Sequence, residues 1–393
     1  MKTLNTIIRR EIAARGVLSF ARFMELALYC PVYGYYEAKK DNPGQRGDFY
    51  TSVSIGKLFG QLLAFQFAGW LEPLRIASTL RGRATAEDGD CGLRIVEAGA
   101  HNGQLAKDIL DWLRSNRPKL FGQIKYCIIE PSIRRQEWQQ EVLHEFAPRV
   151  CWFTGFQSLL QERTCHSSPA TRHPPLCGVI FSNELLDAMP VHRFGWDAGK
   201  KEWFEWGVAV DGDQFAWARI PDTLAPQSGE RGAFENLPLE LLAALPDGYI
   251  IETSPTAENW WRQAASVLGC GRLMTIDYGF TTNEMFSPSR TRGTLRAYFH
   301  HHVTDDLLAN VGEQDLTAHV DFSAIQAAGE SAGLTTESFP TQTQFLTRIL
   351  EKTLKEKTLG KWDAKRTRQF QTLTHPDHLG RAFRVLIQSR CSS

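Results

Sequence analysis

A short apolar strand that runs into a glycine turn and then a helix limits this chain to a small set of α/β folds. The stretch reads Arg94-Ile-Val-Glu-Ala-Gly-Ala-His-Asn-Gly-Gln104, and a helix-forming segment follows over residues 105–113. A buried strand, a glycine turn and a helix N-terminus, in this order, form the nucleotide-binding crevice of α/β proteins. Glu97 lies at the strand end, and Glu130 closes the next apolar strand, residues 126–130. The sequence therefore predicts a nucleotide-like ligand at this turn.

The residue types at the turn favour S-adenosylmethionine over a dinucleotide. Backbone N–H groups at a helix N-terminus suit the methionine carboxylate, and Gly99 and Gly103 would supply that turn. Glu130 could accept both ribose hydroxyls, and Glu97 could reach the methionine ammonium through water. A dinucleotide pyrophosphate needs Gly-x-Gly-x-x-Gly, whereas this turn has only two glycines, Gly99-Ala-His-Asn-Gly103.

The order of predicted elements suggests one α/β core with additions. Strands and helices alternate over residues 93–182, which predicts a parallel sheet with helices on both faces. After Pro190, aromatic residues at strand-like spacing, broken by turn dipeptides, predict an antiparallel meander. We therefore expect three parts: a helical cap that contributes to the cofactor site (1–80), the core with C-terminal helices (93–190 and 250–390) and an inserted β-meander or substrate subdomain (191–249).

Composition excludes several classes of protein. The 393 residues carry a formal net charge of zero, which argues against nonspecific nucleic-acid binding and against attraction to an acidic membrane. No apolar run approaches the roughly 20 residues of a membrane span. The spacing of Leu4, Ile7, Ile8 and Ile12 predicts an amphipathic helix rather than a presequence. We expect a bacterial cytoplasmic protein, in preference to one of the mitochondrial matrix.

The cysteines and nearby histidines predict no metal site. Eight cysteines are scattered without a Cys-x-x-Cys pair, which is typical of thiols in a reducing compartment. Residues 163–177 contain Cys165, His166, His173 and Cys177, but their spacing matches no zinc template. A polar loop is the simpler interpretation of that segment.

The segment Phe181-Ser-Asn-Glu-Leu-Leu-Asp-Ala-Met-Pro190 is a candidate reaction centre at the end of the fourth strand of the alternating region. We expect Asn183 to cap a short helix that carries Glu184 and Asp187 on one face. Such acids could simply complement the helix dipole. Their position at the carboxyl end of a parallel strand favours a second interpretation, in which they hold a cationic substrate.

Two other polar stretches precede predicted helices. Ser52 or Ser54 could cap the helix that follows, and Asp321 could cap the helix over residues 323–333. His319 has no capping role of this kind. A lone histidine is more often a core residue than a catalyst, so His319 stays a candidate for proton transfer, together with Asp321.

Longer motifs along the chain resemble one family in sequence and in order. They are Phe23-Met-Glu-Leu-Ala-Leu-Tyr29, Gly34-Tyr-Tyr36, Gly47-Asp-Phe49, Glu130-Pro-Ser132, Ser182-Asn-Glu-Leu-Leu-Asp-Ala-Met-Pro-Val191, Glu252-Thr-Ser-Pro255, Ile276-Asp-Tyr-Gly279, Gly293-Thr-Leu-Arg-Ala-Tyr298 and Leu316-Thr-Ala-His-Val-Asp-Phe322. From about residue 18 to 388 the chain is similar to the MidA family of class I methyltransferases. The resemblance implies a Rossmann-like fold with a mostly parallel seven-stranded sheet, an N-terminal helical cap and an inserted antiparallel β and helical subdomain.

The resemblance also implies roles for individual residues. It places Gly47, Asp48 and Phe49 beside the cofactor, Glu97, Gly99, Gly103 and Glu130 in the cofactor turn and ribose site, and Asn183, Glu184 and Asp187 at the reaction centre. The turn departs from the family's usual Gly-Pro-Gly-x-Gly, because Ala100 and His101 occupy its second and third positions. Histidine tolerates positive φ better than most residues, yet its side chain would crowd a backbone that approaches a ligand. Weaker cofactor binding is therefore one expectation for this chain.

The implied activity is S-adenosylmethionine-dependent methylation of a protein arginine. Mitochondrial members of the family assist assembly of respiratory complex I, and the best-known implied reaction is symmetric dimethylation of an arginine on a core subunit. Two alternatives stay open: a binding or assembly factor with a degenerate cofactor pocket, and a small-molecule methyltransferase. The expected partner is an arginine-bearing protein, with no nucleic acid and no metal, and a homodimer is compatible with the sequence.

Overall fold

The computed structural model describes residues 3–38, 51–80, 92–162, 176–221, 239–287, 290–300 and 302–390. The chain forms two compact units, each assembled from three separate stretches. The sheet unit comprises Tyr50–Leu185, Trp261–Tyr278 and Ala328–Ser393, and the meander unit comprises Met1–Phe49, Leu186–Trp260 and Gly279–Ala327.

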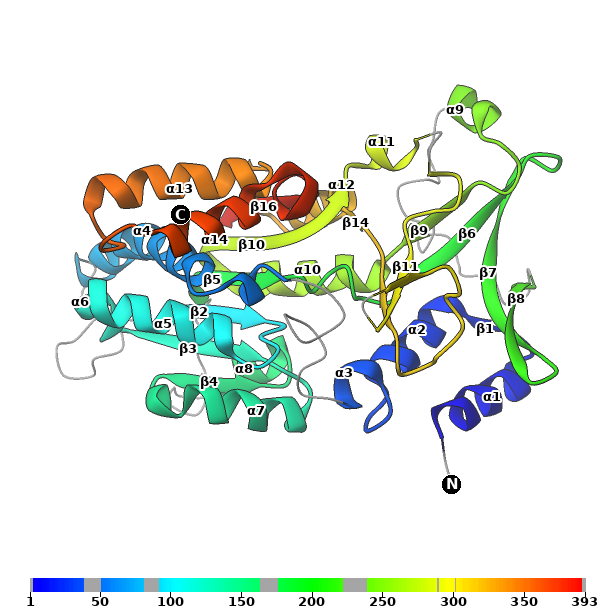
Figure 1. Cartoon of the computed structure of the whole chain (residues 1–393), viewed down its shortest axis with the longest axis horizontal. Coiled ribbons are helices and arrows are strands. Elements are labelled where there is room, and N and C mark those ends of the chain that lie inside the picture. The colour runs from blue at the N-terminus through cyan, green and yellow to red at the C-terminus, as the bar shows by residue number, and fades with distance from the viewer. Residues whose placement is uncertain are drawn as a thin grey trace, which may run out of the picture. The chain divides into compact units, whose positions relative to one another are not determined.

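The sheet unit contains a seven-strand path with five neighbouring parallel strands (Figure 1). In spatial order the strands are β15 (Thr335–Ser338), β16 (Phe383–Arg390), β10 (Leu268–Phe280), β5 (Leu176–Asn183), β2 (Leu93–Ala98), β3 (Ile124–Ile129) and β4 (Val150–Phe153). The strands from β10 to β4 are parallel, whereas β16 runs antiparallel to both β10 and β15. This confirms the predicted mostly parallel sheet, whereas its strand number is eight rather than the predicted seven, because a further short strand pairs with β10 outside this path.

Helices bury the sheet because their apolar residues and those of the strands form one core. The 23-residue helix α4 (Leu58–Leu80) contributes buried residues along most of its length, among them Phe59 and Phe67. Alternate residues of the strands join the same cluster, including Tyr126 of β3 and Phe181 of β5. The other helical elements of this unit are α5 (Gln104–Asn116), α6 (Pro118–Phe121), α7 (Ile133–Leu143), α8 (Phe156–Glu162), α13 (Gln342–Glu356), α14 (Ala364–Thr374) and the short turns η1 (Val53–Ile55), η2 (His144–Phe146) and η6 (Pro376–Gly380).

The meander unit contains the predicted antiparallel strands. β6 (His192–Asp197), β7 (Glu202–Asp211) and β8 (Gln214–Arg219) follow one another in the chain, and β1 (Leu18–Ser19) and β9 (Ile250–Thr253) complete a five-stranded sheet. A second, three-stranded sheet has the order β12 (His302–Thr304), β11 (Arg296–Phe299), β13 (Asp315–Thr317), and β14 (Val320–Asp321) pairs with the last two residues of β10. Its other helices are α1 (Leu4–Arg15), α2 (Phe20–Tyr29), α3 (Tyr35–Ala38), α9 (Leu239–Ala244) and α11 (Thr282–Met285), while α10 (Pro255–Val267) and α12 (Phe322–Ser331) cross the boundary between the units.

The compact units follow different boundaries from those expected in the sequence. Residues 1–80 do not stay together, because β1 pairs with β7 while α4 packs in the core of the sheet unit. Aromatic contacts explain why the first helices pack with the meander. The ring centroids of Phe20 and Trp217 are 5.0 Å apart, and those of Phe23 and Phe215 are 5.6 Å apart. The first helices therefore belong with the meander.

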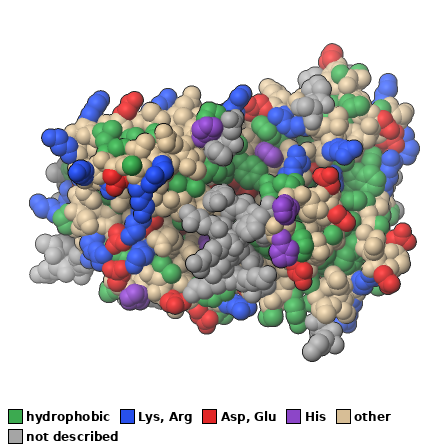
Figure 2. Space-filling view, viewed as in Figure 1, with side chains coloured by type: hydrophobic (Ala, Val, Ile, Leu, Met, Phe, Trp, Pro, Cys, Tyr) green, Lys and Arg blue, Asp and Glu red, His purple; other side chains and the backbone are tan. Residues whose placement is uncertain are grey.

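Charge is spread over the face of the molecule shown in Figure 2, where acidic and basic side chains lie among one another. This agrees with 44 basic and 44 acidic residues in the sequence. Among the residues that the structure describes, no helix combines the length and the apolar character needed to cross a membrane.

Candidate functional site

The turn between β2 and α5 has the backbone conformation that the sequence predicts. Gly99, His101 and Gly103 have φ values of 76°, 46° and 84°, all in the left-handed region. The N–H of Gly103 donates to the carbonyl of Ala100 at 2.7 Å, which closes the turn directly before α5. His101 is thus part of the turn, as its tolerance of positive φ allows. The sheet unit contains the whole arrangement.

The imidazole of His101 is uncharged near neutral pH. Burial lowers its pKa to about 4, and the positive charge of Arg135 acts in the same direction. A neutral ring does not repel a cationic ligand, so His101 adds no electrostatic penalty to a sulfonium bound at this turn.

Gln139 connects the turn to Glu130, and sequence reasoning missed it. Its side-chain amide donates to the carbonyl of His101 at 3.0 Å and to Oε2 of Glu130 at 3.1 Å. The indole N–H of Trp152 donates to its Oε1 at 3.0 Å, which fixes the orientation of the amide. The sequence shows only a polar residue in a predicted helix. The structure reveals that this residue of α7 is fully buried.

Glu130 lies just beyond the C-terminal end of β3 and is 3% exposed. Its Oε1 accepts the N–H of Ser132 at 3.1 Å, and Nε of Arg135 lies 3.6 Å from its Oε2. These contacts hold a carboxylate at the strand end, where hydroxyl groups of a ribose could donate to it. Glu130 is thus a buried acid at the strand end, and its role as the ribose acceptor stays a prediction.

Glu97 is the last residue but one of β2, and its side chain is buried. The hydroxyl of Tyr126 donates to its Oε2 at 2.6 Å. Burial raises the pKa of Glu97 to about 7, although the Tyr126 hydrogen bond acts in the opposite direction. Its predicted contact with the methionine ammonium stays a prediction.

The residues present at this site fit S-adenosylmethionine. Three residues with left-handed φ values form the turn before a 13-residue helix, whose N-terminus favours a carboxylate. The carboxylate of Glu130 supplies the acceptor for ribose hydroxyls. The pairing of donors at the turn with an acceptor at the next strand matches the two ends of this cofactor.

The predicted helix after Asn183 is wrong. Residues 184–190 form bends and turns, and Glu184 has a φ of 53°. Two hydrogen bonds to β10 produce this turn: the N–H of Glu184 donates to the carbonyl of Ile276 at 2.9 Å, and the N–H of Leu185 donates to Asp277 at 3.2 Å. Asn183 therefore caps no helix, and Asp277 is a second site residue whose role the sequence did not reveal.

The structure brings Asn183 and Glu184 together. Oε1 of Glu184 accepts the amide N–H of Asn183 at 2.9 Å and the backbone N–H of Ser52 at 3.0 Å. Burial raises the pKa of Glu184 to about 7, while these two hydrogen bonds lower it. Ser52 thus contributes its backbone to the site rather than a helix cap, and its side chain makes no capping hydrogen bond.

Asp187 belongs to the meander unit, unlike Asn183 and Glu184, which belong to the sheet unit. It is 5% exposed, and its backbone carbonyl accepts the N–H of Ala318 at 2.9 Å. The hydroxyl of Tyr29 donates to the next carbonyl, that of Ala188, at 2.9 Å. A shared helical face for Glu184 and Asp187 is excluded by the turn between them.

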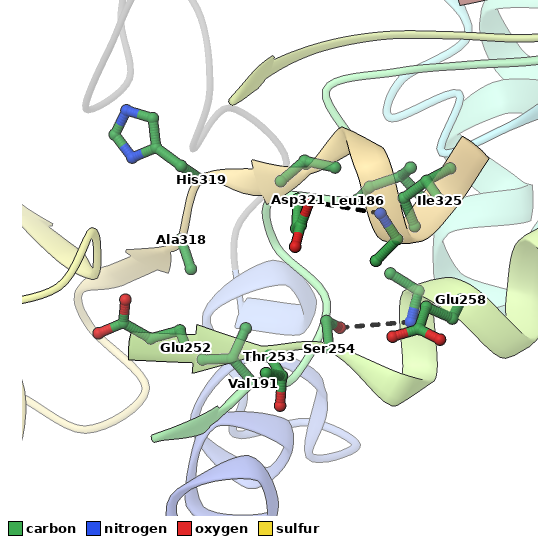
Figure 3. A pocket seen from close by; sticks show the side chains of 13 residues that line it. Leu186, Val191, Glu252, Thr253, Ser254, Glu258, Ala318, His319, Asp321 and Ile325 are labelled. Atoms are coloured by element: carbon green, nitrogen blue, oxygen red, sulfur yellow. Dashed lines mark hydrogen bonds between the residues drawn. The ribbon is translucent and has the colours of Figure 1, made fainter. Parts of the chain in front are cut away.

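His319 borders a small pocket of the meander unit, which Glu252, Ser254 and Asp321 also line. Its ring stacks on Phe280 with centroids 4.8 Å apart, and burial lowers its pKa to about 4. In Figure 3 the ring projects away from Asp321 and Ser254. Asp321 accepts the N–H groups of Ser323 and Ala324, which confirms it as the cap of α12.

Gly47, Asp48 and Phe49 lie outside the described residues. Within the part of the chain that the structure describes, no group of three or more His, Cys, Asp or Glu side chains is arranged to hold a metal ion.

Comparison with known proteins identifies the family and its cofactor. The sequence profile of a family of S-adenosyl-L-methionine-dependent methyltransferases matches residues 78–339. The mitochondrial protein arginine methyltransferase NDUFAF7 of Mus musculus is 29% identical over 346 residues, which cover 82% of this chain and 69% of that protein. The Homo sapiens protein of the same name is 28% identical over 341 residues, with 82% and 68% covered.

A solved structure supports the same assignment. A Burkholderia thailandensis protein crystallised with S-adenosyl-homocysteine superimposes with a TM-score of 0.76 and is 30% identical, covering 98% of this chain and 92% of that one. That ligand is the demethylated form of the cofactor predicted for the turn after β2. The chain belongs to the MidA family of S-adenosylmethionine-dependent methyltransferases.

Proposed function

We propose that this methyltransferase transfers its methyl group to an arginine side chain of a protein. Two side-chain oxygen acceptors at the end of β5, which make no hydrogen bond within the described residues, support this proposal. Both hydrogen bonds to the Glu184 carboxylate go to Oε1, and within the described residues its Oε2 accepts none. Oδ1 of Asn183 is buried and likewise has no hydrogen-bond partner among the described residues. A guanidinium, with five N–H donors in a planar fork, matches such acceptors.

The proposed role of Glu184 is to orient the acceptor and stabilise its charge. A guanidinium has a pKa above about 12 and is a poor nucleophile. A carboxylate that binds two of its nitrogens directs the third and keeps positive charge away from it. Bound S-adenosylmethionine supplies an electrophilic methyl group to that nitrogen. A cation beside Glu184 also lowers its pKa from about 7, so the carboxylate stays ionised during the reaction.

Proton removal is assigned to the meander unit in this proposal. His319 is neutral near pH 7, because burial lowers its pKa to about 4, and the same shift makes its ring a weak base, since the best general bases have a pKa near the working pH. The alternative acceptor, Asp321, already caps α12 through two backbone N–H groups. His319 and Asp321 both stay candidates for this step.

The proposed acceptor is a subunit of the respiratory complex I type. The support is the similarity to proteins named mitochondrial protein arginine methyltransferase NDUFAF7, at 28% to 29% identity. Such similarity suggests the class of acceptor and leaves its identity to experiment.

A methyl-transfer assay tests the proposal. The full chain is incubated with tritiated S-adenosylmethionine and a lysate of cells that lack it, and the labelled protein is hydrolysed to amino acids. We expect one labelled band, with the label in methylated arginine, and a loss of about 100-fold or more in Glu184→Gln. Cofactor binding by calorimetry should survive that substitution.

Glu351→Gln is the matched control, since Glu351 is an exposed glutamate on α13 of the same unit. It should label the acceptor like the unaltered chain. Label recovered in free metabolites, or in residues other than arginine, would contradict the proposed acceptor and favour the small-molecule alternative.

A further inference from the structure

Two Cys-Gly dipeptides lie side by side in the sheet. Cys177-Gly178 is on β5 and Cys270-Gly271 is on β10, and the strand register pairs cysteine with cysteine and glycine with glycine. The Sγ atoms of the two cysteines are 2.7 Å apart, and both are thiols in the structure. The two cysteines are 93 positions apart in the chain, and the segment between them includes the longest stretch of the meander unit.

The glycines explain why the strands approach closely at this point. Gly178 and Gly271 have φ values of 150° and 122°, which side-chain-bearing residues rarely adopt. A Cβ atom at Gly271 would lie 1.9 Å from the carbonyl oxygen of Gly178, so no other residue fits without a shift of the backbone. A register shift between Leu268 and Cys270 adjusts β10 immediately before the pair.

The placement satisfies the geometric requirements of a disulfide. Neighbouring strands lie about 4.7–4.9 Å apart, within the range of about 4.4–6.8 Å between Cα atoms that a disulfide needs. Register partners also direct their side chains to the same face of a sheet. Cys270 is 7% exposed, and Cys177 is half-buried against the hydrophobic core. The half-buried thiol is the one that a small reagent can reach.

We propose that Cys177 and Cys270 form a reversible disulfide when the protein meets a small-molecule disulfide such as oxidised glutathione. The Cys177 thiolate attacks one sulfur of the reagent, forms a mixed disulfide and releases one thiol. The Cys270 thiolate then attacks Sγ of Cys177 and releases the second thiol. The two cysteines lose two electrons and two protons, and the reagent is reduced to two thiols.

The bond would tie together the two strands that flank a long excursion of the chain. The chain leaves the sheet unit after Leu185 and returns at Trp261, so a bond between residues 177 and 270 closes a loop around that excursion. Closing a long loop restricts the unfolded chain. The oxidised protein should therefore unfold several degrees higher than the reduced protein.

Peptide mapping of the full chain tests the proposal. The protein is treated with oxidised glutathione, unfolded with N-ethylmaleimide present and digested with trypsin without reduction. We expect residues 173–193 and 263–272, which carry one cysteine each, to appear as one linked peptide. Dithiothreitol should separate them and lower the thermal midpoint to the reduced value.

A second register pair, Cys127 and Cys151, provides an internal comparison on β3 and β4. Neither is followed by glycine, so residues 126–134 and 150–163 should be recovered alkylated. Linkage of those two peptides with Cys177 and Cys270 both alkylated would overturn the proposal.

The variant Cys270→Ser should abolish both the linked peptide and the rise in thermal midpoint, while Cys30→Ser of the meander unit should keep both. If Cys270→Ser fails to fold, the dithiothreitol reversal in the unaltered chain still decides the matter. A rise in midpoint without the 177–270 linkage would also refute the proposal. None of these outcomes depends on the methyl acceptor.

Discussion

The hydroxyl of Tyr126 on β3 donates a 2.6 Å hydrogen bond to Oε2 of Glu97 on β2, so two neighbouring parallel strands share a buried acid beside the cofactor turn. Burial raises the pKa of Glu97 from 4.5 to about 7. The folded protein therefore holds a proton on Glu97 over a pH range in which the unfolded chain has already released it.

A pH-dependent stability follows from that buried acid. Between about pH 4.5 and pH 7 the folded state binds more protons at Glu97, so its contribution falls as pH rises and is constant above pH 7. Glu97→Gln should remove this slope and gain up to roughly 3 kcal/mol of unfolding free energy at pH 8 relative to pH 4.5. Urea unfolding without cofactor, at several pH values, measures it.

The comparison with the unaltered chain is essential, because Glu184, whose pKa burial also raises to about 7, adds to this pH dependence, whereas His101 and His319 oppose it. Burial lowers the pKa of both to about 4, so their contribution is lost as pH falls from about 6.5. Glu137→Gln, at an exposed position on α7, is the control and should keep the original slope. Equal slopes for all three proteins would show that Glu97 is ionised throughout.

Gln139 should affect both the affinity for the cofactor and the stability of the fold. Gln139→Leu removes the donor shared by the His101 carbonyl and Glu130, which leaves two buried acceptors with one partner fewer. We expect the Kd for S-adenosylmethionine to rise about 10-fold and the unfolding free energy to fall by about 1–3 kcal/mol. Calorimetry and urea unfolding measure the two quantities. Gln140→Leu, exposed on the same helix, should change neither.

The turn residue His101 provides a test of backbone strain. His101→Gly should raise the unfolding free energy by about 0.5–1 kcal/mol, because glycine adopts a φ of 46° at little cost. His101→Val should lower it by about 1–2 kcal/mol, because a β-branched residue is disfavoured there. If the imidazole crowds the cofactor, the glycine variant also binds S-adenosylmethionine more tightly. Unchanged affinity would remove that expectation.

His319 is predicted to affect turnover rather than cofactor binding. His319→Gln should lower kcat for methyl transfer by about 100-fold, the usual contribution of a general base, with an unchanged Kd for S-adenosylmethionine. His302→Gln, at an exposed position in the same unit, should leave kcat unaffected. Full turnover in His319→Gln would contradict the role in proton transfer and leave His319 with a packing role, in which its ring stacks on Phe280.

The parts of the fold that sequence predicts well are those with a local signal. β2, β3, β4 and β5 are short apolar runs between turn residues, and β7 and β8 alternate aromatic residues around Asp211-Gly212. The cofactor turn was predictable for the same reason, since glycines, a strand-end acid and a helix follow one another. Each of these elements is determined within about ten residues of chain.

The failures arise where distant residues decide the local conformation. The turn at Glu184 depends on Ile276 and Asp277, more than 90 residues away, so the local preference for a helix after Asn183 was misleading. Gln139 is a site residue only because α7 packs it between His101 and Glu130. The spacing of residues in the sequence predicts neither the contacts of this turn with β10 nor those of Gln139.

The position of β16 has a consequence for the order in which the protein can be made. Phe383–Arg390 lies between β10 and β15, although both of these strands precede it in the chain, so the sheet has an exposed gap in its interior until residues 383–390 have been synthesised. A ribosome that stops early releases a chain in which β10 presents an open edge, the kind of surface that recruits other strands. A chain that stops before residue 383 should therefore yield aggregates rather than a slightly shortened enzyme.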